Sequence, residues 1–359
     1  MTTIDERAVE RITITRLSRD AKRAMATLGI AEARWLVDTY YQLQDNRIRA
    51  NNQVREAGDA GEPHAALEWL ADQFKAMEYD IKTGLGNYAM AQPVGPWLDS
   101  IYGIGPVISA GLLANLDIKR APTAGHFWRI CGLDPSSKWI SASDAAAIVA
   151  KYKSPRSALT GEITMLQLAM IAGDANRRPE TLLVDGKIPP RDKLAKKLSI
   201  PPWNHGLKRL CFLIGESFVK FQNQPDCFYG KIFAQWKADE WAANLAGKNA
   251  EQAGRDSQRY GKTTVAYKFM SGAYSPSQIR TFLEAGESIP VGLKPAEYGG
   301  IKMFCPLHIH QRARRKVVKL FLSHLHAVWY RLEYGTEPPV IYAVEHMGHR
   351  HTIEPPTAI

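Results

Sequence analysis

A short stretch of glycine, proline and apolar residues has the composition of a turn that could hold a phosphate. It reads Gly103-Ile104-Gly105-Pro106-Val107. Glycine allows backbone angles that other residues avoid, and proline suits the first turn of a helix. Backbone N–H groups at such a helix start can bind a phosphate oxygen. The pattern predicts a helix-hairpin-helix that binds DNA through these five residues and, because it contacts phosphates, reads no bases.

Two other interpretations of the same stretch need weighing. A plain glycine-rich turn between two helices fits the residues and stays open. A dinucleotide-binding fingerprint fits less well, because no strand precedes Gly103 and no third glycine follows Gly105 at the required step.

Positive charge is the second feature with a chemical meaning. The chain has a net charge of +10, and residues 186–220 and 302–333 each carry +6, so these two segments hold the whole excess. Such clustering favours a surface that faces phosphates, although two solvated helix faces explain it as well. The residues predicted to neutralise a DNA backbone are Lys208, Arg209, Arg312, Arg315, Lys316 and Lys319.

Histidine and cysteine spacing raises the question of zinc. Residues 305–310 contain one cysteine and two histidines, and residues 346–351 contain three histidines. A structural zinc site needs four ligands in a closed tetrahedron, and these spacings are irregular. We therefore expect surface or core-edge histidines, no metal site and no cofactor.

Length and composition set the class of protein. The chain has 359 residues, of which 45% are hydrophobic and 23% charged, and this balance excludes a mostly disordered protein. Four cysteines lie scattered, no signal peptide is recognisable at the polar start, and no apolar run approaches a membrane span. We expect a soluble protein of a prokaryotic cytoplasm, or one encoded by a virus or plasmid, with no membrane partner.

The elements that position these residues are predicted to be helices throughout. The expected fold class is all-α: a helical or coiled-coil arm, then a helix-hairpin-helix domain with helical insertions. The predicted parts are the arm (1–95), the hairpin domain (96–235) with an insertion (140–200), a polar insertion (236–305), an amphipathic basic helix (306–335) and an extended tail (336–359).

Several details of these parts are also predicted. In the arm, a helix over 65–82 carries an apolar stripe at 67–81 that needs a partner, which suggests a homo-oligomer. In the hairpin, Ile104 should enter the core, and small residues at 109–111 should let the two hairpin helices approach closely. In the polar insertion, Thr263–Phe269 is expected to form a short β-hairpin.

The residues around the hairpin resemble a known family. Gly103-Ile104-Gly105-Pro106, the leucine-rich helix after it, the Pro-Thr-Ala turn at 122–124 and Gly132-Leu133-Asp134-Pro135 look like the C-terminal half of the insertion-sequence one-ten (IS116/IS902-type) transposases. The helices at 203–210 and 314–320 are similar to two further helices of that family. The match is good over about 97–135 and patchy elsewhere.

The resemblance implies DNA binding in transposition or recombination, an RNA guide, a RuvC-like acidic nuclease domain and a serine nucleophile. The first 95 residues read as helices, so we expect no RuvC-like domain here, and Mg²⁺ only if a partner supplies a nuclease site. Ser141 lies nearest to the position of the family serine, but no glycine follows it.

The sequence therefore predicts a transposase-like DNA-binding protein, with Ser141 as the nucleophile if it is an enzyme. One alternative is a catalytically inactive architectural or branched-DNA-binding factor derived from such a transposase. The other alternative is a helical structural interaction protein, which would show no salt-dependent DNA binding.

Overall fold

A computed structural model describes residues 13–61, 65–134, 136, 139–152, 162–275, 277, 301–339 and 353–357. Within these ranges every regular element is a helix, so the predicted all-α class is confirmed. The chain divides into two compact units, which we treat separately. The main unit comprises residues 1–124 and 210–359, and the inserted unit comprises residues 125–209.

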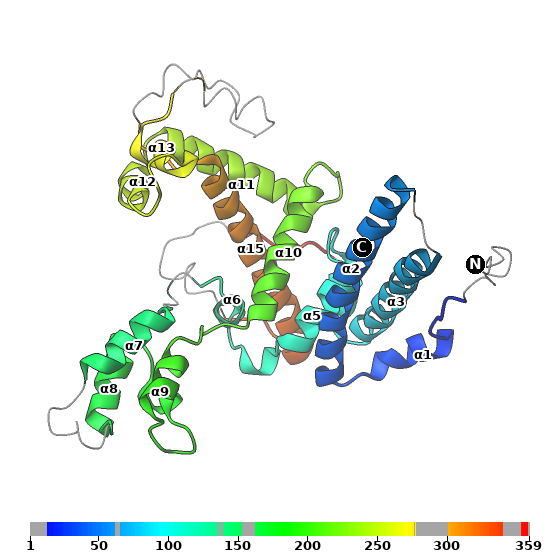
Figure 1. Cartoon of the computed structure of the whole chain (residues 1–359), viewed down its shortest axis with the longest axis horizontal. Coiled ribbons are helices and arrows are strands. Elements are labelled where there is room, and N and C mark those ends of the chain that lie inside the picture. The colour runs from blue at the N-terminus through cyan, green and yellow to red at the C-terminus, as the bar shows by residue number, and fades with distance from the viewer. Residues whose placement is uncertain are drawn as a thin grey trace, which may run out of the picture. The chain divides into compact units, whose positions relative to one another are not determined.

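The N-terminal helices form the arm that the sequence predicts. A short helix precedes a long pair, and the two long helices lie side by side along most of their length (Figure 1). Helix α3 continues past the predicted end at Lys82 and stops three residues before Pro93. The elements are α1 (Arg19–Ala24), η2 (Met25–Thr27), α2 (Ile30–Asp59) and α3 (Ala65–Met90).

In the first part of α3, the buried residues are two alanines and one carboxylate. Ala71 and Ala76 are buried, and so is Asp80, which accepts hydrogen bonds from the side chains of Arg16 and Lys22. These bonds hold the segment before α1 against α3, and they keep the pKa of the Asp80 carboxyl well below its usual range. The predicted apolar stripe faces outward in part, because Leu70 remains 36% exposed.

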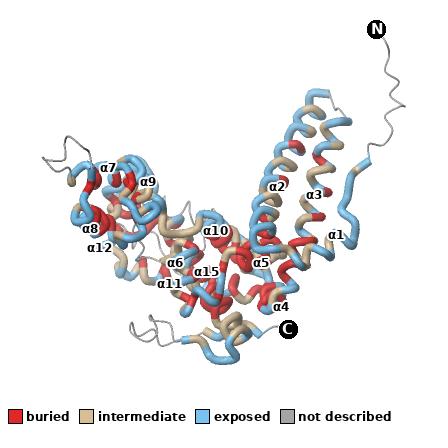
Figure 2. Tube along the Cα trace, turned by 90° about the horizontal axis from the view of Figure 1, so that it is seen from below, coloured by how far each residue is buried: buried red, intermediate tan, exposed pale blue. Residues whose placement is uncertain are grey.

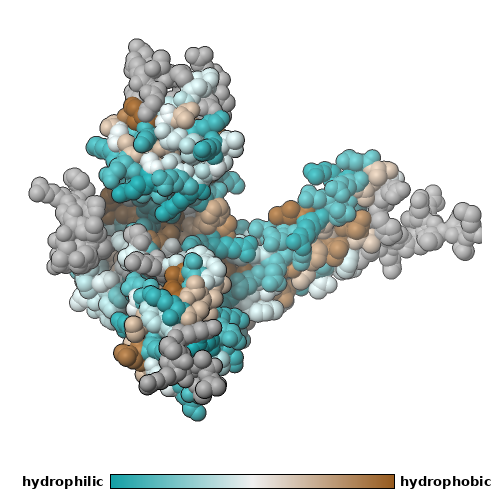
Figure 3. Space-filling model, turned by 60° about the vertical axis from the view of Figure 1, so that its left-hand side comes forward, coloured by the Kyte–Doolittle hydropathy of each residue, from teal (hydrophilic) through white to brown (hydrophobic). Residues whose placement is uncertain are grey.

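Figures 2 and 3 show how buried and hydrophobic residues are distributed along the arm. Buried residues are sparse along α2 and α3 and dense where α5 meets them (Figure 2). In the space-filling view, hydrophobic side chains interrupt the hydrophilic surface of the arm (Figure 3).

The predicted hairpin consists of helices α4 (Gly95–Ser100) and α5 (Pro106–Asn115), followed by η3 (Ile118–Arg120) and α6 (Ala124–Ile130). Helix α5 packs against both α2 and α3. Gly111 makes this possible, because a Cβ there would lie 2.7 Å from Leu210 Cδ1 and 3.4 Å from Val37 Cγ1. The sequence predicted that this small residue lets the two hairpin helices approach closely. In the structure, Gly111 instead makes room for side chains of α10 and α2.

The rest of the main unit is built around the longer helices α10, α11 and α15, with the shorter helices α12 and α13 beside them. These elements are α10 (His205–Lys220, whose residues from 210 onward belong to this unit), α11 (Phe228–Leu245), α12 (Ala250–Ser257), α13 (Val265–Ser271) and α15 (Pro306–Tyr334). Helix α15 packs along α11. Its apolar residues Phe321 and Leu325 are buried, whereas Leu332, which the sequence placed on the same apolar face, is 54% exposed.

The β-hairpin expected at Thr263–Phe269 is wrong, because this segment enters helix α13. Thr264 caps the helix by accepting a hydrogen bond from the Tyr267 N–H, and Gly272 ends it in the left-handed conformation. Phe269 and Met270 then face a small core that also contains Trp241 of α11. Cap residues at both ends favour the helix, and two adjacent buried residues do not fit the alternating pattern of a half-buried strand.

The inserted unit has its own hydrophobic core. Its remaining elements are α7 (Ala142–Lys151), α8 (Met165–Asp174), η4 (Pro179–Leu182) and α9 (Arg191–Leu198). Leu168, Ile171, Leu194 and Leu198 are completely buried against one another. The described residues between 142 and 198, inside the predicted insertion, thus form a small helical module.

No helix in the described ranges is both long enough and apolar enough to cross a bilayer. Most of the predicted extended tail, residues 340–352 and 358–359, lies outside the described residues.

Candidate nucleic-acid interface

The turn between α4 and α5 depends on one glycine with unusual backbone angles. Gly103 has φ +94°, a conformation that residues with a side chain rarely adopt. The following residue, Ile104, is buried as predicted, and its N–H donates to the carbonyl of Ile101 over 3.0 Å. The turn is thus fixed by a local bond and by an apolar side chain inserted into the core.

Two carbonyls of the turn point towards the protein. Ser217 of α10 donates from Oγ to the Gly103 carbonyl over 2.6 Å, and the Cys227 thiol donates to the Tyr102 carbonyl over 3.8 Å. The backbone approaches α10 closely here, since a Cβ on Gly103 would lie 3.0 Å from Ser217 Oγ.

The N–H groups at the start of α5 are placed differently. Gly105 is the N-cap residue and Pro106 occupies the first helical position. Within the described part of the chain, the N–H groups of Gly105, Val107 and Ile108 have no acceptor. Open space adjoins Gly105, because no atom lies within 4 Å of where its Cβ would be. A helix start with free donors and a positive dipole end can receive a phosphate oxygen.

An aromatic core supports the hairpin from behind. Trp97 of α4 stacks on Phe321 of α15 with ring centres 6.0 Å apart, and Phe218 of α10 stacks on Tyr229 at 4.8 Å. Phe321 also meets the Phe218 ring edge-on at 5.7 Å. Helices α4, α10, α11 and α15 therefore meet in one packed cluster, which gives the turn a rigid base.

A C-terminal segment completes this support. The indole N–H of Trp97 donates to the Pro356 carbonyl over 3.0 Å, and His324 Nε2 lies 2.7 Å from the Ile353 carbonyl. Because a carbonyl only accepts, Nε2 carries the proton, and Tyr229 donates from its hydroxyl to His324 Nδ1 over 2.8 Å. Burial lowers the pKa of His324 to about 4, so the ring is neutral at ordinary pH.

Three residues beside the turn were missed by sequence reasoning. Tyr102 is 41% exposed, and its ring meets Phe221 edge-on at 5.3 Å. Lys220 is exposed and its Nζ lies 5.3 Å from the centre of the Phe221 ring. The sequence offered no signal for this grouping, because Tyr102 and Phe221 lie more than a hundred residues apart.

Two of the predicted phosphate-binding cations are engaged within the protein. Arg312 donates to Glu240 of α11 over 2.8 Å, and Lys316 binds the other oxygen of the same carboxylate. Glu240 is only 5% exposed. Its burial disfavours the charged form, but Lys316 and Arg312 outweigh that cost and hold the pKa of the Glu240 carboxyl below its usual range.

The other predicted cations lie in different settings. Arg315 is exposed and has no ion-pair partner among the described residues, whereas Lys319 is half-buried. Lys208 and Arg209 are exposed and belong to the inserted unit, where Lys208 Nζ lies 3.9 Å from the centre of the Trp203 ring. The main unit therefore holds the hairpin and the α15 cations, and the inserted unit holds the other two.

Ser141 starts a helix. It is the N-cap residue of α7, and its Oγ accepts from the Asp144 N–H over 3.2 Å. The same oxygen lies 2.7 Å from Asp144 Oδ2 and 2.8 Å from Ser143 Oγ. A catalytic role for Ser141 stays a prediction, and the observed hydrogen bonds are those of a capping residue.

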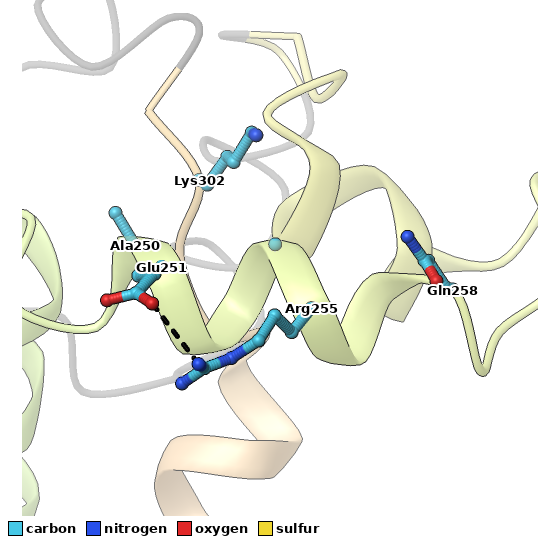
Figure 4. Close-up of a pocket in the computed structure, with 6 residues that line it drawn as sticks. Ala250, Glu251, Arg255, Gln258 and Lys302 are labelled. Carbon is cyan, nitrogen blue, oxygen red and sulfur yellow. Dashed lines mark hydrogen bonds and ion pairs between the residues drawn. The ribbon is translucent and has the colours of Figure 1, made fainter.

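Two further features were candidates for a site: the histidine and cysteine clusters and one open pocket. No group of three or more potential metal ligands occurs among the described residues, and His346, His349 and His351 lie outside them. An open pocket of about 410 Å³ borders α12, where Arg255 is paired with Glu251 over 3.1 Å (Figure 4). Its lining residues are Ala250, Glu251, Gly254, Arg255, Gln258 and Lys302.

Comparison with known proteins identifies the hairpin region. Residues 96–146 match the family model of the transposase IS116/IS110/IS902 family, which confirms the resemblance seen in the sequence. The matched segment contains α5, the turn before it and all of α4 except its first residue, Gly95. No curated protein and no solved structure matches the chain. A transposase-family domain at this position implies DNA binding related to transposition.

Proposed function

We propose that this protein binds duplex DNA through the α4–α5 hairpin and acts in DNA transposition or site-specific recombination. The observation that carries the proposal is the set of free N–H donors on Gly105, Val107 and Ile108, located inside the matched transposase segment. Amide donors bind phosphate oxygens whatever the base sequence, so the hairpin would position the protein on DNA without selecting a site.

Exposed cations would add long-range attraction to this contact. Arg315 and Lys220 are exposed in the main unit, and Lys208 and Arg209 are exposed in the inserted unit. Each cation that neutralises a phosphate releases counterions and makes binding more sensitive to salt. Neutral amides contribute affinity with little salt dependence of their own.

The direct test is binding to a fluorescent duplex over a series of salt concentrations. The proposal expects binding at low salt and a linear fall of log affinity with log salt concentration. Absence of binding at low salt would contradict it and would favour a helical protein that assembles with other proteins.

A second candidate is a DNA-binding factor without catalytic activity, and the position of Ser141 favours it. Ser141 Oγ donates to the Asp144 carboxylate, which could accept its proton, but the same oxygen also accepts the backbone N–H of Asp144 and is thereby held in a helix cap instead of being presented to a phosphate. Strand cleavage or a covalent DNA adduct that disappears in Ser141→Ala would restore the enzyme hypothesis. Unchanged cleavage in the variant would place the activity elsewhere.

We also propose that the arm mediates self-association. Leu70 and Met77 lie two turns apart on α3 and are 36% and 39% exposed, and they belong to the stripe that the sequence predicted to need a partner. Sedimentation of the protein and of Leu70→Glu/Met77→Glu tests this: dissociation to a monomer is expected, and an unchanged mass would contradict it.

A further inference from the structure

Tyr102 and Phe221 form an aromatic pair beside the hairpin turn, and Tyr102 is partly exposed. Tyr102 is the residue immediately before Gly103, and its neighbours Ile101 and Ile104 supply the buried side chains of the turn. The Tyr102 ring itself is 41% exposed, so it contributes little to the core. Its backbone is fixed all the same, because the Tyr102 carbonyl accepts from Cys227 and the next one from Ser217.

Phe221 links this ring to the turn. The Phe221 ring meets Tyr102 at 5.3 Å with an angle of 81° between the planes, and its Cδ2 lies 3.6 Å from where a Cβ on Gly103 would be. One helical turn earlier, Phe218 is fully buried and anchors the same face of α10. Tyr102 is thus held by an edge-to-face contact and is not free to collapse onto the surface.

A cation also contacts the Phe221 ring of this aromatic pair. Lys220 Nζ lies 5.3 Å from the centre of the Phe221 ring, and the Lys220 side chain is exposed. The residues around the turn therefore combine an exposed aromatic ring with a positive charge. Proteins that bind single-stranded nucleic acid use this pairing: bases stack on the rings and cations follow the phosphates.

We propose that Tyr102, supported by Phe221 and flanked by Lys220, binds an unpaired base next to the phosphate held by the hairpin. Bases inside a duplex are stacked on their neighbours and present only their edges, whereas a base at a frayed end, overhang or branch can stack on a protein ring. The preferred substrate is then DNA with unpaired bases beside a duplex. This inference rests on the proposed function and specifies its substrate.

The experiment compares three DNA probes that share one duplex. The first is blunt, the second carries a single-stranded overhang of thymidines, and the third carries an overhang of abasic sites with the same phosphates. Overhangs at both the 3′ and the 5′ end are used. Stacking of one base predicts that the protein binds the thymidine overhang about fivefold or more tightly than the abasic overhang at one of these ends.

The variants assign that preference to a side chain. Tyr102→Ala is expected to bind the thymidine and abasic overhangs equally while its affinity for the blunt duplex stays within about twofold, and Tyr102→Phe should keep the preference because it keeps the ring. Trp35→Ala is the matched control, since Trp35 on the arm is 66% exposed and should not affect the preference. Thermal unfolding confirms that each variant folds.

The outcomes separate this inference from the proposed function. Equal binding of the thymidine and abasic overhangs by the unaltered protein would overturn the inference and leave duplex binding intact. An equal loss on all three probes in Tyr102→Ala would also overturn it, because it would show a structural role. Failure of the unaltered protein to bind even the blunt duplex would overturn both proposals.

Discussion

The α4–α5 hairpin and the basic stretch of α15 differ in which of their groups have partners inside the protein. The hairpin turn contains no charged side chain, yet three of its N–H groups have no acceptor among the described residues. The stretch of α15 from Arg312 to Lys319 contains five cations, but Arg312 and Lys316 are paired with one buried carboxylate, Glu240. Charge counted in a sequence therefore measures poorly what a surface can offer to a phosphate.

The two regions also differ in how they are supported. The turn rests on the aromatic cluster of Trp97, Phe218 and Phe321, which holds its backbone in place. In α15, Arg314 is buried, lies 4.0 Å from the centre of the Phe212 ring and pairs with Glu216, so it serves the packing between α10 and α15. Under the proposed function, the backbone of the hairpin makes the DNA contact, whereas three of the five α15 cations are paired within the protein.

Substitution of Gly103 is expected to have the largest effect. Gly103→Ala forces a side chain into φ +94° and places its Cβ 3.0 Å from Ser217 Oγ. We expect the free energy of unfolding to fall by about 1–3 kcal/mol and DNA binding to be lost with the turn. Chemical denaturation and binding to a duplex measure both effects.

Gly105→Ala is the matched control for that variant. Gly105 has an extended backbone with φ −93°, and open space surrounds the position of its Cβ. The loss of stability should stay within about 1 kcal/mol, the cost of an alanine at an N-cap position. Equal destabilisation by the two substitutions would show that the turn does not depend on the special angles of Gly103.

Arg312→Ala tests whether the α15 charge serves folding. The substitution leaves Glu240 buried with only one of its two cations, so we expect a loss of about 1–3 kcal/mol in the free energy of unfolding. The salt dependence of DNA binding should not change, because Arg312 is engaged within the protein. A large change in salt dependence without loss of stability would reverse the assignment.

Arg315→Ala is the counterpart three residues further along the same helix. Arg315 is exposed and free of ion pairs in the described structure, so its loss should leave stability unchanged within about 0.5 kcal/mol. If Arg315 contacts a DNA phosphate, the slope of log affinity against log salt should become shallower by about one. An unchanged slope would remove α15 from the interface.

A smaller effect is expected from pH. Glu240 has a lowered pKa in the folded protein, so its ion pairs stabilise the fold above the pKa of an unfolded glutamate, about 4.3, and this stability is lost as pH falls through the lower folded value. Glu240→Gln should flatten the dependence of unfolding free energy on pH in that acidic range. The same dependence in both proteins would contradict the assignment to Glu240.

Local patterns in the sequence predicted much of this molecule. The Gly-Ile-Gly-Pro run identified the hairpin and the buried Ile104, because the backbone requirements of a tight turn are visible in residue types. The helix in place of a β-hairpin at 263–269 was missed, since its caps, Thr264 and Gly272, look like ordinary loop residues until the helix between them is seen.

What the sequence could not supply was pairing between distant segments. Glu240 lies more than seventy residues before the two cations that it binds, and Phe221 lies more than a hundred after Tyr102. No local pattern in the sequence links such distant positions. Neither the pairing of the α15 cations with Glu240 nor the contact between Tyr102 and Phe221 was therefore predictable from one sequence.

The most direct test of the account is Gly105→Asp. The extended backbone at Gly105 accepts any residue, and an aspartate at this N-cap position would itself bind the N–H groups of Val107 or Ile108. Stability should stay the same or rise by a few tenths of a kcal/mol, while affinity for duplex DNA falls by about tenfold or more, because the carboxylate occupies the donors and repels phosphate. A stable Gly105→Asp protein that binds DNA as tightly as the unaltered chain would contradict the claim that the hairpin amides hold the phosphate.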